Sequence, residues 1–279
     1  MIQKPMKGVG ENRMKLFVSA DIEGTCGICN WDETEKGHPD YAYFSKQMTR
    51  EVCSVCEAAL ESGRVDDIFI KDAHDSARNI NPELLPEKIK ILRGWEGAPG
   101  PMMSGIELGC DAVAMTGYHS AAFTDGNPLS HTMNLQNQYV KINGRYASEF
   151  MLNTYQAAYF GVPVIFVSGD KALCESAREL CPNIETACVN EGWGGASVSI
   201  HPEAALKLIR EKMKRALERN LSDYLIQLPE HFHVEIEFKE FVRAKKGSYY
   251  PGAKREGSKG VSFDTDDYYE VLRFLFFVL

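Results

Sequence analysis

The hydrophobic positions in the first two thirds of the chain fall into short apolar runs, and each run is followed by small or acidic residues. Four of these runs are rich in β-branched residues and occupy residues 16–20, 67–70, 112–115 and 162–167. Short apolar runs that end in turn-forming residues are typical of strands buried on both faces of a sheet. The pattern therefore predicts four parallel strands.

Segments with the apolar spacing expected for helices lie between and after these strands. They cover residues 43–62, 104–108, 148–160 and 172–180, and glycines follow several of them as stop signals. Parallel strands need a crossover connection of about a dozen residues, which a helix usually supplies. We therefore expect an α/β protein with a three-layer, phosphorylase/hydrolase-like core, in which a parallel sheet carries helices on both faces.

The pattern changes after residue 202, where the expected elements become amphipathic. They are a charged helix at residues 203–219, an alternating strand at 233–241, an exposed loop at 245–260 and a final helix at 266–279. The chain is thus expected to have an N-terminal extension at residues 1–13, a large α/β domain at 14–202 and a smaller C-terminal α+β portion at 203–279.

The composition excludes several classes of partner. The 279 residues carry a formal net charge of −8 without a dense stripe of Lys and Arg, so nucleic-acid binding is not expected. No run approaches the roughly 20 apolar residues that span a membrane. Residues 1–13 lack the apolar centre of a signal peptide, and a chain of this length folds without disulfides. We therefore expect a soluble cytoplasmic protein whose eight cysteines are reduced.

Two acidic side chains follow the first predicted strand. Asp21 and Glu23 are two residues apart, so they point to the same side of an extended chain. Two neighbouring carboxylates repel each other unless a cation lies between them or one of them is protonated. Gly24 and Gly27 allow the backbone to turn away after the pair. The pair indicates a metal site, although these carboxylates could instead cap the following turn.

A histidine follows each of the next two predicted strands. His74 comes shortly after the second strand, and His119 comes shortly after the third. Ligands of open parallel sheets bind beyond the carboxyl ends of the strands, so these histidines can converge with Asp21 and Glu23. A single histidine after a strand is more often structural, and the prediction depends on three strand ends of the same kind.

Glu149 and His131 extend this candidate site. Glu149 lies near the start of the helix expected at residues 148–160, where a carboxylate suits the helix dipole. Five ligands exceed the four of one tetrahedral zinc, and a shared aspartate among histidines and carboxylates is typical of two-metal hydrolytic sites. His131 remains available for catalysis, and residues 14–202 become the candidate metal-binding catalytic domain. Taken singly, Glu149 could be a solvated helix residue and His131 a hydrogen-bonding loop residue.

Five short motifs follow one another in a characteristic order. They are Ser19-x-Asp21-x-Glu23-Gly24, Lys71-Asp72-Ala73-His74, Gly117-Tyr118-His119, Ser130-His131-Thr132-Met133 and Glu149-x-x-x-Asn153-x-Tyr155. In order and spacing they resemble the motifs of the DppA-type D-aminopeptidases, a family of self-compartmentalising zinc metallopeptidases. The resemblance runs from about residue 14 to the C-terminal region, and its specific motifs lie within residues 19–170.

The resemblance implies a site, an activity and an assembly. Asp21 would bridge two zinc ions in each subunit, and the remaining ligands would be Glu23, His74, His119 and Glu149. His131 would be the catalytic residue, either as a nucleophile or as a group that moves protons or stabilises an oxyanion. The implied enzyme is an aminopeptidase that removes N-terminal residues, which could be D-amino acids, from short peptides or amino-acid amides. The family also implies a homo-oligomer, a decamer of stacked pentamers.

Cysteine spacing supports a competing hypothesis. Cys26-x-x-Cys29 and Cys53-x-x-Cys56 have the spacing of a structural four-thiolate zinc site, which would make the chain an α/β binding module. Cys53 and Cys56, however, lie three residues apart in a predicted helix, where they fit an apolar stripe better than a metal-binding turn.

Three weaker features have simpler interpretations. The glycine-rich segments at residues 94–97 and 192–195 lack the pattern of a nucleotide-binding loop and are expected to form turns, which could line the site entrance. His231 and His233 flank apolar residues and are expected on a solvated strand face rather than around a metal. The aromatic segment at residues 274–279 could belong to the core or to a subunit contact.

Overall fold

The computed structural model describes residues 13–279, so all but the last residue of the expected extension at 1–13 lies outside the described residues. The larger of the two sheets in this part of the chain has seven strands in the order β3-β2-β1-β4-β7-β8-β9. The strands are β1 (Met14–Ala20), β2 (Val65–Asp72), β3 (Ile89–Leu92), β4 (Ala112–Tyr118), β7 (Val164–Asp170), β8 (Glu185–Trp193) and β9 (Ala196–Ser199). Neighbouring strands are parallel except for the antiparallel pair β8 and β9. The sheet is therefore mixed and mostly parallel, and β1, β2, β4 and β7 are the four predicted strands.

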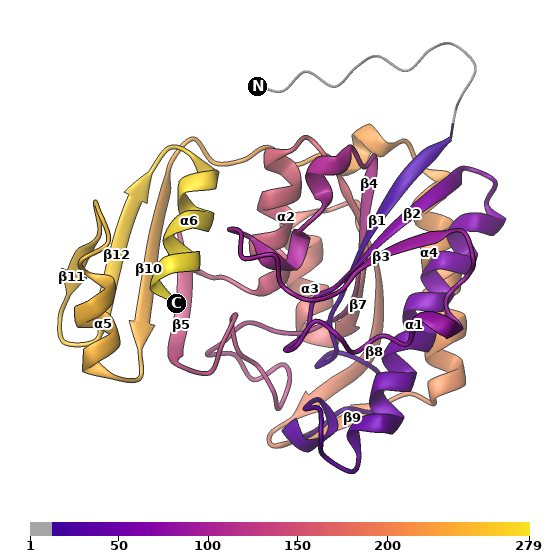
Figure 1. The fold of residues 1–279 in the computed structure, drawn as a ribbon, viewed down its shortest axis with the longest axis horizontal. Helices are drawn as coiled ribbons and strands as arrows, with labels where there is room; N and C mark the ends of the chain where they lie inside the picture. The colour runs from indigo at the N-terminus through magenta and orange to yellow at the C-terminus, as the bar shows by residue number, and fades with distance from the viewer. Residues whose placement is uncertain (1–12) are drawn as a thin grey trace.

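Helices cover both faces of this sheet (Figure 1). They are α1 (Tyr41–Glu61) and α4 (Pro202–Glu218) on one face, and α2 (Glu149–Tyr159) and α3 (Lys171–Leu180) on the other. Successive residues of a strand point to opposite faces of its sheet. Leu16 of β1 accordingly belongs to the core beneath α1 and α4, whereas Phe17 belongs to the core beneath α2 and α3. The expected three-layer α/β core is confirmed.

A second sheet of five antiparallel strands lies beside the large one (Figure 1), in the order β11-β12-β10-β5-β6. Its strands are β5 (Asn137–Ile142), β6 (Arg145–Tyr146), β10 (Phe232–Phe238), β11 (Lys254–Glu256) and β12 (Gly260–Thr265), and its helices are α5 (Phe241–Gly247) and α6 (Tyr268–Val278). α2 connects the two parts, because Phe150 packs in the core of the large sheet and Leu152 in the core of the small one. The first residue of α2, Glu149, is thereby fixed where the two sheets meet.

Segments from both sides of residue 202 pack together in the structure. α4, which lies after that residue, packs against α1 and β8 on the large sheet. β5 and β6, which lie before it, belong to the small sheet and pair with β10 and with each other. The large sheet with its covering helices and the small sheet therefore each include segments from both sides of residue 202. The expected division into domains stays a prediction.

Two predicted elements differ from the structure. The helix expected at residues 104–108 is replaced by two short 3-10 helices, η3 (Pro101–Met103) and η4 (Ile106–Leu108). The glycines on each side of η4, Gly105 and Gly109, have positive φ angles and prevent its extension. The prediction of a loop at residues 245–260 is wrong in part, because β11 pairs with β12 across a turn. β12 also pairs with β10, and this additional pairing stabilises the hairpin in spite of its polar sequence.

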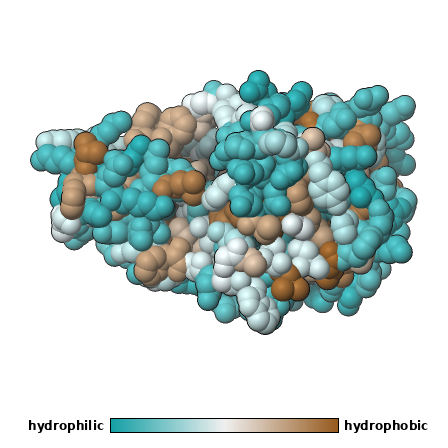
Figure 2. All heavy atoms as spheres, turned by 90° about the horizontal axis from the view of Figure 1, so that it is seen from below, coloured by the Kyte–Doolittle hydropathy of each residue, from teal (hydrophilic) through white to brown (hydrophobic). Residues whose placement is uncertain are grey.

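The final helix is confirmed, and its aromatic residues divide between two environments. Phe274 and Val278 of α6 are buried in the core of the small sheet, whereas Phe277 is 63% exposed. Figure 2 shows one face of the molecule, on which hydrophobic residues form separate patches among hydrophilic ones. Within residues 13–279, no helix combines the length and hydrophobicity required to cross a membrane.

Candidate active site and metal centre

The first four predicted site residues follow three adjacent strands of the large sheet. Asp21 and Glu23 follow β1, His74 follows β2 and His119 follows β4, and β1 lies between β2 and β4. Because these strands are parallel, their carboxyl ends lie at one edge of the sheet. The side chains therefore meet at this edge, as the sequence predicts.

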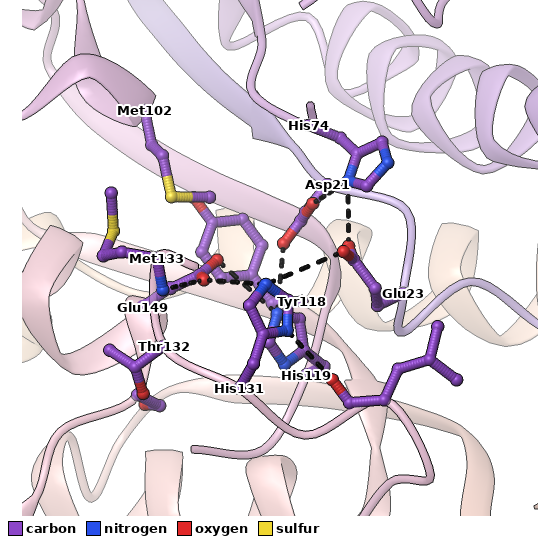
Figure 3. A network of polar contacts seen from close by, with 12 residues as sticks. Asp21, Glu23, His74, Met102, Tyr118, His119, His131, Thr132, Met133 and Glu149 are labelled. Atoms are coloured by element: carbon purple, nitrogen blue, oxygen red, sulfur yellow. Dashed lines mark hydrogen bonds and ion pairs between the residues drawn. The ribbon is translucent and has the colours of Figure 1, made fainter. Parts of the chain in front are cut away.

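Glu149 and His131 reach the same place from other elements. Glu149 begins α2, whose preceding residue Ser148 caps the helix by accepting a hydrogen bond from the backbone N–H of Met151. His131 lies in the loop that leads from β4 to β5. Figure 3 shows all six predicted side chains pointing into a single cluster: Asp21, Glu23, His74, His119, His131 and Glu149.

Asp21 lies between two histidines. His74 Nδ1 is 3.4 Å from Asp21 Oδ1 and 3.1 Å from Glu23 Oε2. His119 Nε2 is 3.7 Å from Asp21 Oδ2 and 3.5 Å from Glu149 Oε2. Asp21 thus presents one carboxylate oxygen to each histidine, which is the arrangement required of a residue that bridges two cations.

Backbone carbonyl groups fix the orientation of both histidines. His74 Nε2 lies 3.0 Å from the carbonyl oxygen of Thr34, and His119 Nδ1 lies 2.9 Å from that of Ser120. A carbonyl oxygen only accepts hydrogen bonds, so in a neutral ring these nitrogens carry the proton. The other nitrogen of each ring then faces the carboxylates with a free lone pair, as in metal-binding histidines.

Three buried atoms in the cluster have no hydrogen-bond partner among the described residues: Asp21 Oδ2, Glu23 Oε2 and His119 Nε2. Buried polar atoms without partners are rare, because each loses its interaction with water without compensation. A metal ion satisfies such atoms when they face a common space. The donor set of carboxylates and imidazoles fits zinc.

The spacing of the ligand atoms also fits zinc. Two ligands about 2.1 Å from one tetrahedral zinc lie about 3.4 Å apart, close to the measured distances between the histidines and their carboxylates. Three sets of ligand atoms lie within 4.8 Å of one another, and two of the sets share Asp21. The sets are Asp21 with Glu23 and His74, Asp21 with His119 and Glu149, and Glu23 with His119 and His131.

The cluster has an excess of negative charge that shifts the pKa values of its members. Burial and the nearby Glu23 carboxylate raise the pKa of Asp21 well above its usual range. Burial alone would lower the pKa of His119, but the carboxylates beside it, chiefly Glu149, raise that pKa to about 10. Burial and the neighbouring His119 lower the pKa of His131. The pocket thus favours positive charge between its carboxylates, which a divalent cation supplies.

Two glycines allow the loops after β1 and β4 to approach each other closely. The backbone N–H of Gly24 donates a hydrogen bond of 2.8 Å to the carbonyl oxygen of Gly117. A Cβ on Gly24 would overlap the backbone of Tyr118, and a Cβ on Gly117 would overlap the backbone oxygen of Asp21. The strand ends that carry Asp21 and His119 could not approach this closely with larger residues at these positions.

Two buried aspartates that the sequence interpretation missed hold the site loops. Asp72, the last residue of β2, accepts hydrogen bonds from the backbone N–H groups of Asn79 and Ile80 and so closes the loop that carries His74. Asp170, the last residue of β7, accepts a hydrogen bond of 2.7 Å from the backbone N–H of Ser120, next to His119. The signal that could have identified both aspartates in the sequence is their position at the ends of strands.

A cavity of about 440 Å³ opens over the cluster. Its walls include the side chains of Trp31, Trp95, Met102 and Met133 in addition to cluster residues. The sequence interpretation assigned no role to Trp31, Met102 or Met133. The glycine-rich turn at residues 94–97 does reach the site, as expected, through Trp95.

Lys71 holds Trp95 in the cavity wall. Its ammonium group lies 4.1 Å from the centre of the Trp95 ring and donates a hydrogen bond of 2.7 Å to the carbonyl oxygen of Gly94. The Trp95 ring nitrogen donates a second hydrogen bond to the carbonyl oxygen of Asp75. Burial lowers the pKa of Lys71 to about 8. The buried lysine therefore positions an aromatic wall of the site.

The four-thiolate hypothesis is not supported by the cysteines. Cys26 Sγ donates to the carbonyl oxygen of Ile200, whereas Cys53 Sγ donates to that of Leu84. Burial raises the pKa of Cys26 to about 12 and that of Cys53 to about 11, so both remain thiols. Within residues 13–279, no potential metal-binding group contains a cysteine.

His231 and His233 interact with carboxylates at the surface rather than with the cluster. His233 Nδ1 lies 2.7 Å from Asp264, and His231 Nδ1 lies 2.6 Å from Asp266. The side chain of His231 is 55% exposed, and that of His233 is half-buried. The expected solvated face is confirmed.

Comparisons with known proteins agree with this geometry. The sequence profile of peptidase family M55, described as D-aminopeptidase, matches residues 14–277. A D-aminopeptidase of Bacillus subtilis (strain 168) is 30% identical over 259 residues, which cover 92% of this chain and 93% of the relative. The solved structure of the Zn-dependent D-aminopeptidase DppA from Bacillus subtilis, a self-compartmentalizing protease, is similar with a TM-score of 0.86 and 28% identity. That similarity covers 94% of this chain and 95% of the other.

Proposed function

Since the chain belongs to the D-aminopeptidase family of peptidases, we propose that it uses two zinc ions to remove N-terminal residues from short peptides. The observation that carries this proposal is the position of Asp21, whose two carboxylate oxygens face two different histidines. A residue in this position can join two metal ions into one catalytic unit. The competing binding-module function is not favoured.

The two sets of ligand atoms that share Asp21 would hold the two ions. Glu23 and His74 would complete the first set, and His119 and Glu149 the second. When bound, zinc acts as a Lewis acid toward the carbonyl oxygen of the scissile bond and toward the attacking water. Residues of the chain hold the ligands in place: Thr34 and Ser120 orient the histidines, and the backbone N–H of Met133 donates to Glu149 Oε1.

His131 would move the proton. Its Nε2 atom lies 3.8 Å from Glu23 Oε1 and 3.5 Å from Glu149 Oε1 at the cavity wall, while Nδ1 contacts the carbonyl oxygen of Leu129. Its lowered pKa keeps the ring neutral at pH 7, so Nε2 can accept a proton from water and return it to the leaving amine. Stacking against His119, at 4.4 Å between ring centres, fixes the plane of the ring. A direct nucleophilic role remains the alternative.

The size of the catalytic cavity supports a small substrate. A cavity of about 440 Å³ is large enough for a short peptide or an amino-acid amide but not for a folded protein. The similar structure from Bacillus subtilis is self-compartmentalizing, which supports a homo-oligomer for this chain. We propose that this oligomer has ten subunits. We also propose a cytoplasmic location, a reducing environment in which thiols such as those of Cys26 and Cys53 stay reduced.

Metal analysis combined with a substrate panel tests the proposal. Purified protein dialysed against zinc should contain two zinc ions per subunit and should hydrolyse L- or D-aminoacyl amides and dipeptides. A strong chelator should abolish activity, and added zinc should restore it. Activity that persists in chelator, without bound metal, would contradict the proposed function. Native mass determination would test the decamer separately.

A further inference from the structure

A second cavity of about 190 Å³ adjoins the catalytic cavity. Leu272, Leu275 and Leu279, in or just after α6, form one wall, and Leu152 of α2 contributes to the other. The predominantly apolar side chains make this space, here called the α6 cavity, suited to an apolar group. None of the five sequence motifs explains an apolar cavity beside a cluster of charged residues.

The two cavities share a wall. Pro101, Met102, Met133 and Asn134 line both of them. Met133 connects this wall to the metal ligands, since its backbone N–H donates a hydrogen bond of 2.7 Å to Glu149 Oε1. Glu149 therefore lies beside the wall that the two cavities share.

The opposite end of the catalytic cavity is acidic. Glu35 and Asp75 line it near His74, and both are exposed to solvent. Figure 3 shows His74 on one side of the cluster and Met102 and Met133 on the other, beside Glu149. The cavity thus has a carboxylate-lined end, a central ligand cluster and an apolar end, in that order.

This order determines how a peptide with a free N-terminus lies in the site. Its ammonium group is attracted to the carboxylates near His74. The first peptide bond then lies at the cluster, and the following residue, about 3.3–3.6 Å further along an extended chain, lies near the α6 cavity. The side chain of the second residue therefore stays in contact with water unless the α6 cavity receives it.

We propose that the α6 cavity binds the side chain of the second substrate residue, so that the enzyme selects short peptides whose second residue is apolar. This inference rests on the proposed aminopeptidase function. A cavity of about 190 Å³ accommodates side chains such as those of leucine and phenylalanine. Glycine at the same substrate position leaves it unfilled.

The size of the selection follows from the burial of apolar surface. Full burial of a leucine side chain corresponds to about a tenfold to hundredfold gain in binding. Because the second residue is held beside the bond that is cleaved, the gain should appear in kcat/KM. Peptides that differ only at the second residue, such as Ala-Gly and Ala-Leu, measure it.

Two variants at the cavity wall test the assignment. Leu279→Trp places a larger side chain in the cavity and should reduce the Leu-to-Gly ratio of kcat/KM about tenfold. Phe276→Ala, at a residue that is 39% exposed, widens the cavity and should shift the preference toward bulkier second residues. Phe277→Ala is the matched control, because Phe277 lies on the same helix, is 63% exposed and does not line the cavity. It should leave the ratio unchanged.

The outcomes separate this inference from the function on which it rests. A preference for apolar second residues that changes in opposite directions in the two wall variants supports the proposal. Equal kcat/KM values for Ala-Gly and Ala-Leu, or a preference that appears only when the first residue is varied, overturn it while leaving the aminopeptidase function intact. Failure to hydrolyse any peptide in the presence of zinc overturns both.

Discussion

Asp21 Oδ2 and His119 Nε2 face each other across 3.7 Å at the centre of the site, and neither atom has a hydrogen-bond partner among the described residues. The separation is too large for a hydrogen bond and close to the spacing of two ligands of one zinc ion. The same aspartate contacts His74 through its other oxygen. We therefore propose Asp21 as the residue on which both proposed metal sites depend.

Replacement of Asp21 by asparagine should remove zinc. The amide lacks the charge needed to bridge two cations, so both sites lose a ligand at once. We expect less than one zinc ion per subunit by metal analysis, and activity at the level of the chelated protein. Asp32→Asn is the control, because Asp32 is exposed and pairs with His38 outside the cluster. Full zinc content in Asp21→Asn would show that Asp21 does not bridge the ions.

Replacement of His131 by alanine should separate catalysis from metal binding. We expect kcat/KM to fall about a hundredfold to ten-thousandfold, which is the usual contribution of a general acid or base. Zinc content should stay close to that of the wild type, because the two sets that share Asp21 do not include His131. His38→Ala, at an exposed histidine, should leave both quantities unchanged. Wild-type turnover in His131→Ala would exclude the proposed proton transfer.

Replacement of Gly117 by alanine should destabilise the site through contact with Asp21. A Cβ at this position would overlap the backbone oxygen of Asp21, in addition to the strain of a side chain at φ 67°. Gly144→Ala is the matched control, since Gly144 has φ 79° but a methyl group there would have no neighbouring atom within 4 Å. We expect a loss of about 1 kcal/mol in the free energy of unfolding for Gly144→Ala. The loss should be several times larger, with weaker zinc binding, for Gly117→Ala. Equal losses would indicate that the close approach is unimportant.

Glu51 should make the stability of the zinc-free protein depend on pH. Burial raises the pKa of this carboxyl to about 7, although Cys26 and Gln47 donate hydrogen bonds to it. The unfolded chain has the lower, ordinary pKa, so the contribution of Glu51 to folding stability is greatest below about pH 4.5 and falls as the pH rises toward 7. The loss is on the order of 3 kcal/mol.

Glu51→Gln keeps the shape and the acceptor oxygen but cannot ionise. Urea unfolding at pH 5 and pH 8 in the presence of a chelator should show that the variant gains stability relative to the wild type as the pH rises. A constant difference between the two proteins at both pH values would show that Glu51 does not titrate in this range.

The residues of the site could be predicted because parallel strands bring their carboxyl ends to one edge. The apolar runs identify β1, β2 and β4, and Asp21, His74 and His119 lie within two residues of their ends. The contribution of Glu149 needs no long-range information either, because its helix begins three residues after the end of β6. Local sequence patterns were therefore sufficient to place these four residues of the candidate site.

The small sheet and the α6 cavity could not be predicted in the same way. β5 pairs with β10, nearly a hundred residues further along the chain, and periodicity does not reveal which distant strands pair. Leu272 and Leu275 have the pattern of an ordinary amphipathic helix, and nothing in that pattern shows that they line a cavity beside the catalytic one. Asp170 was missed because its role depends on the approach of the loop after β4.

Crystals of the zinc-loaded protein, measured at the zinc absorption edge, test the central claim most directly. We predict two anomalous peaks in each subunit on either side of Asp21, one beside His74 and the other beside His119 and Glu149. A single peak, or a peak at the cysteines with none at Asp21, would contradict the proposed two-zinc site.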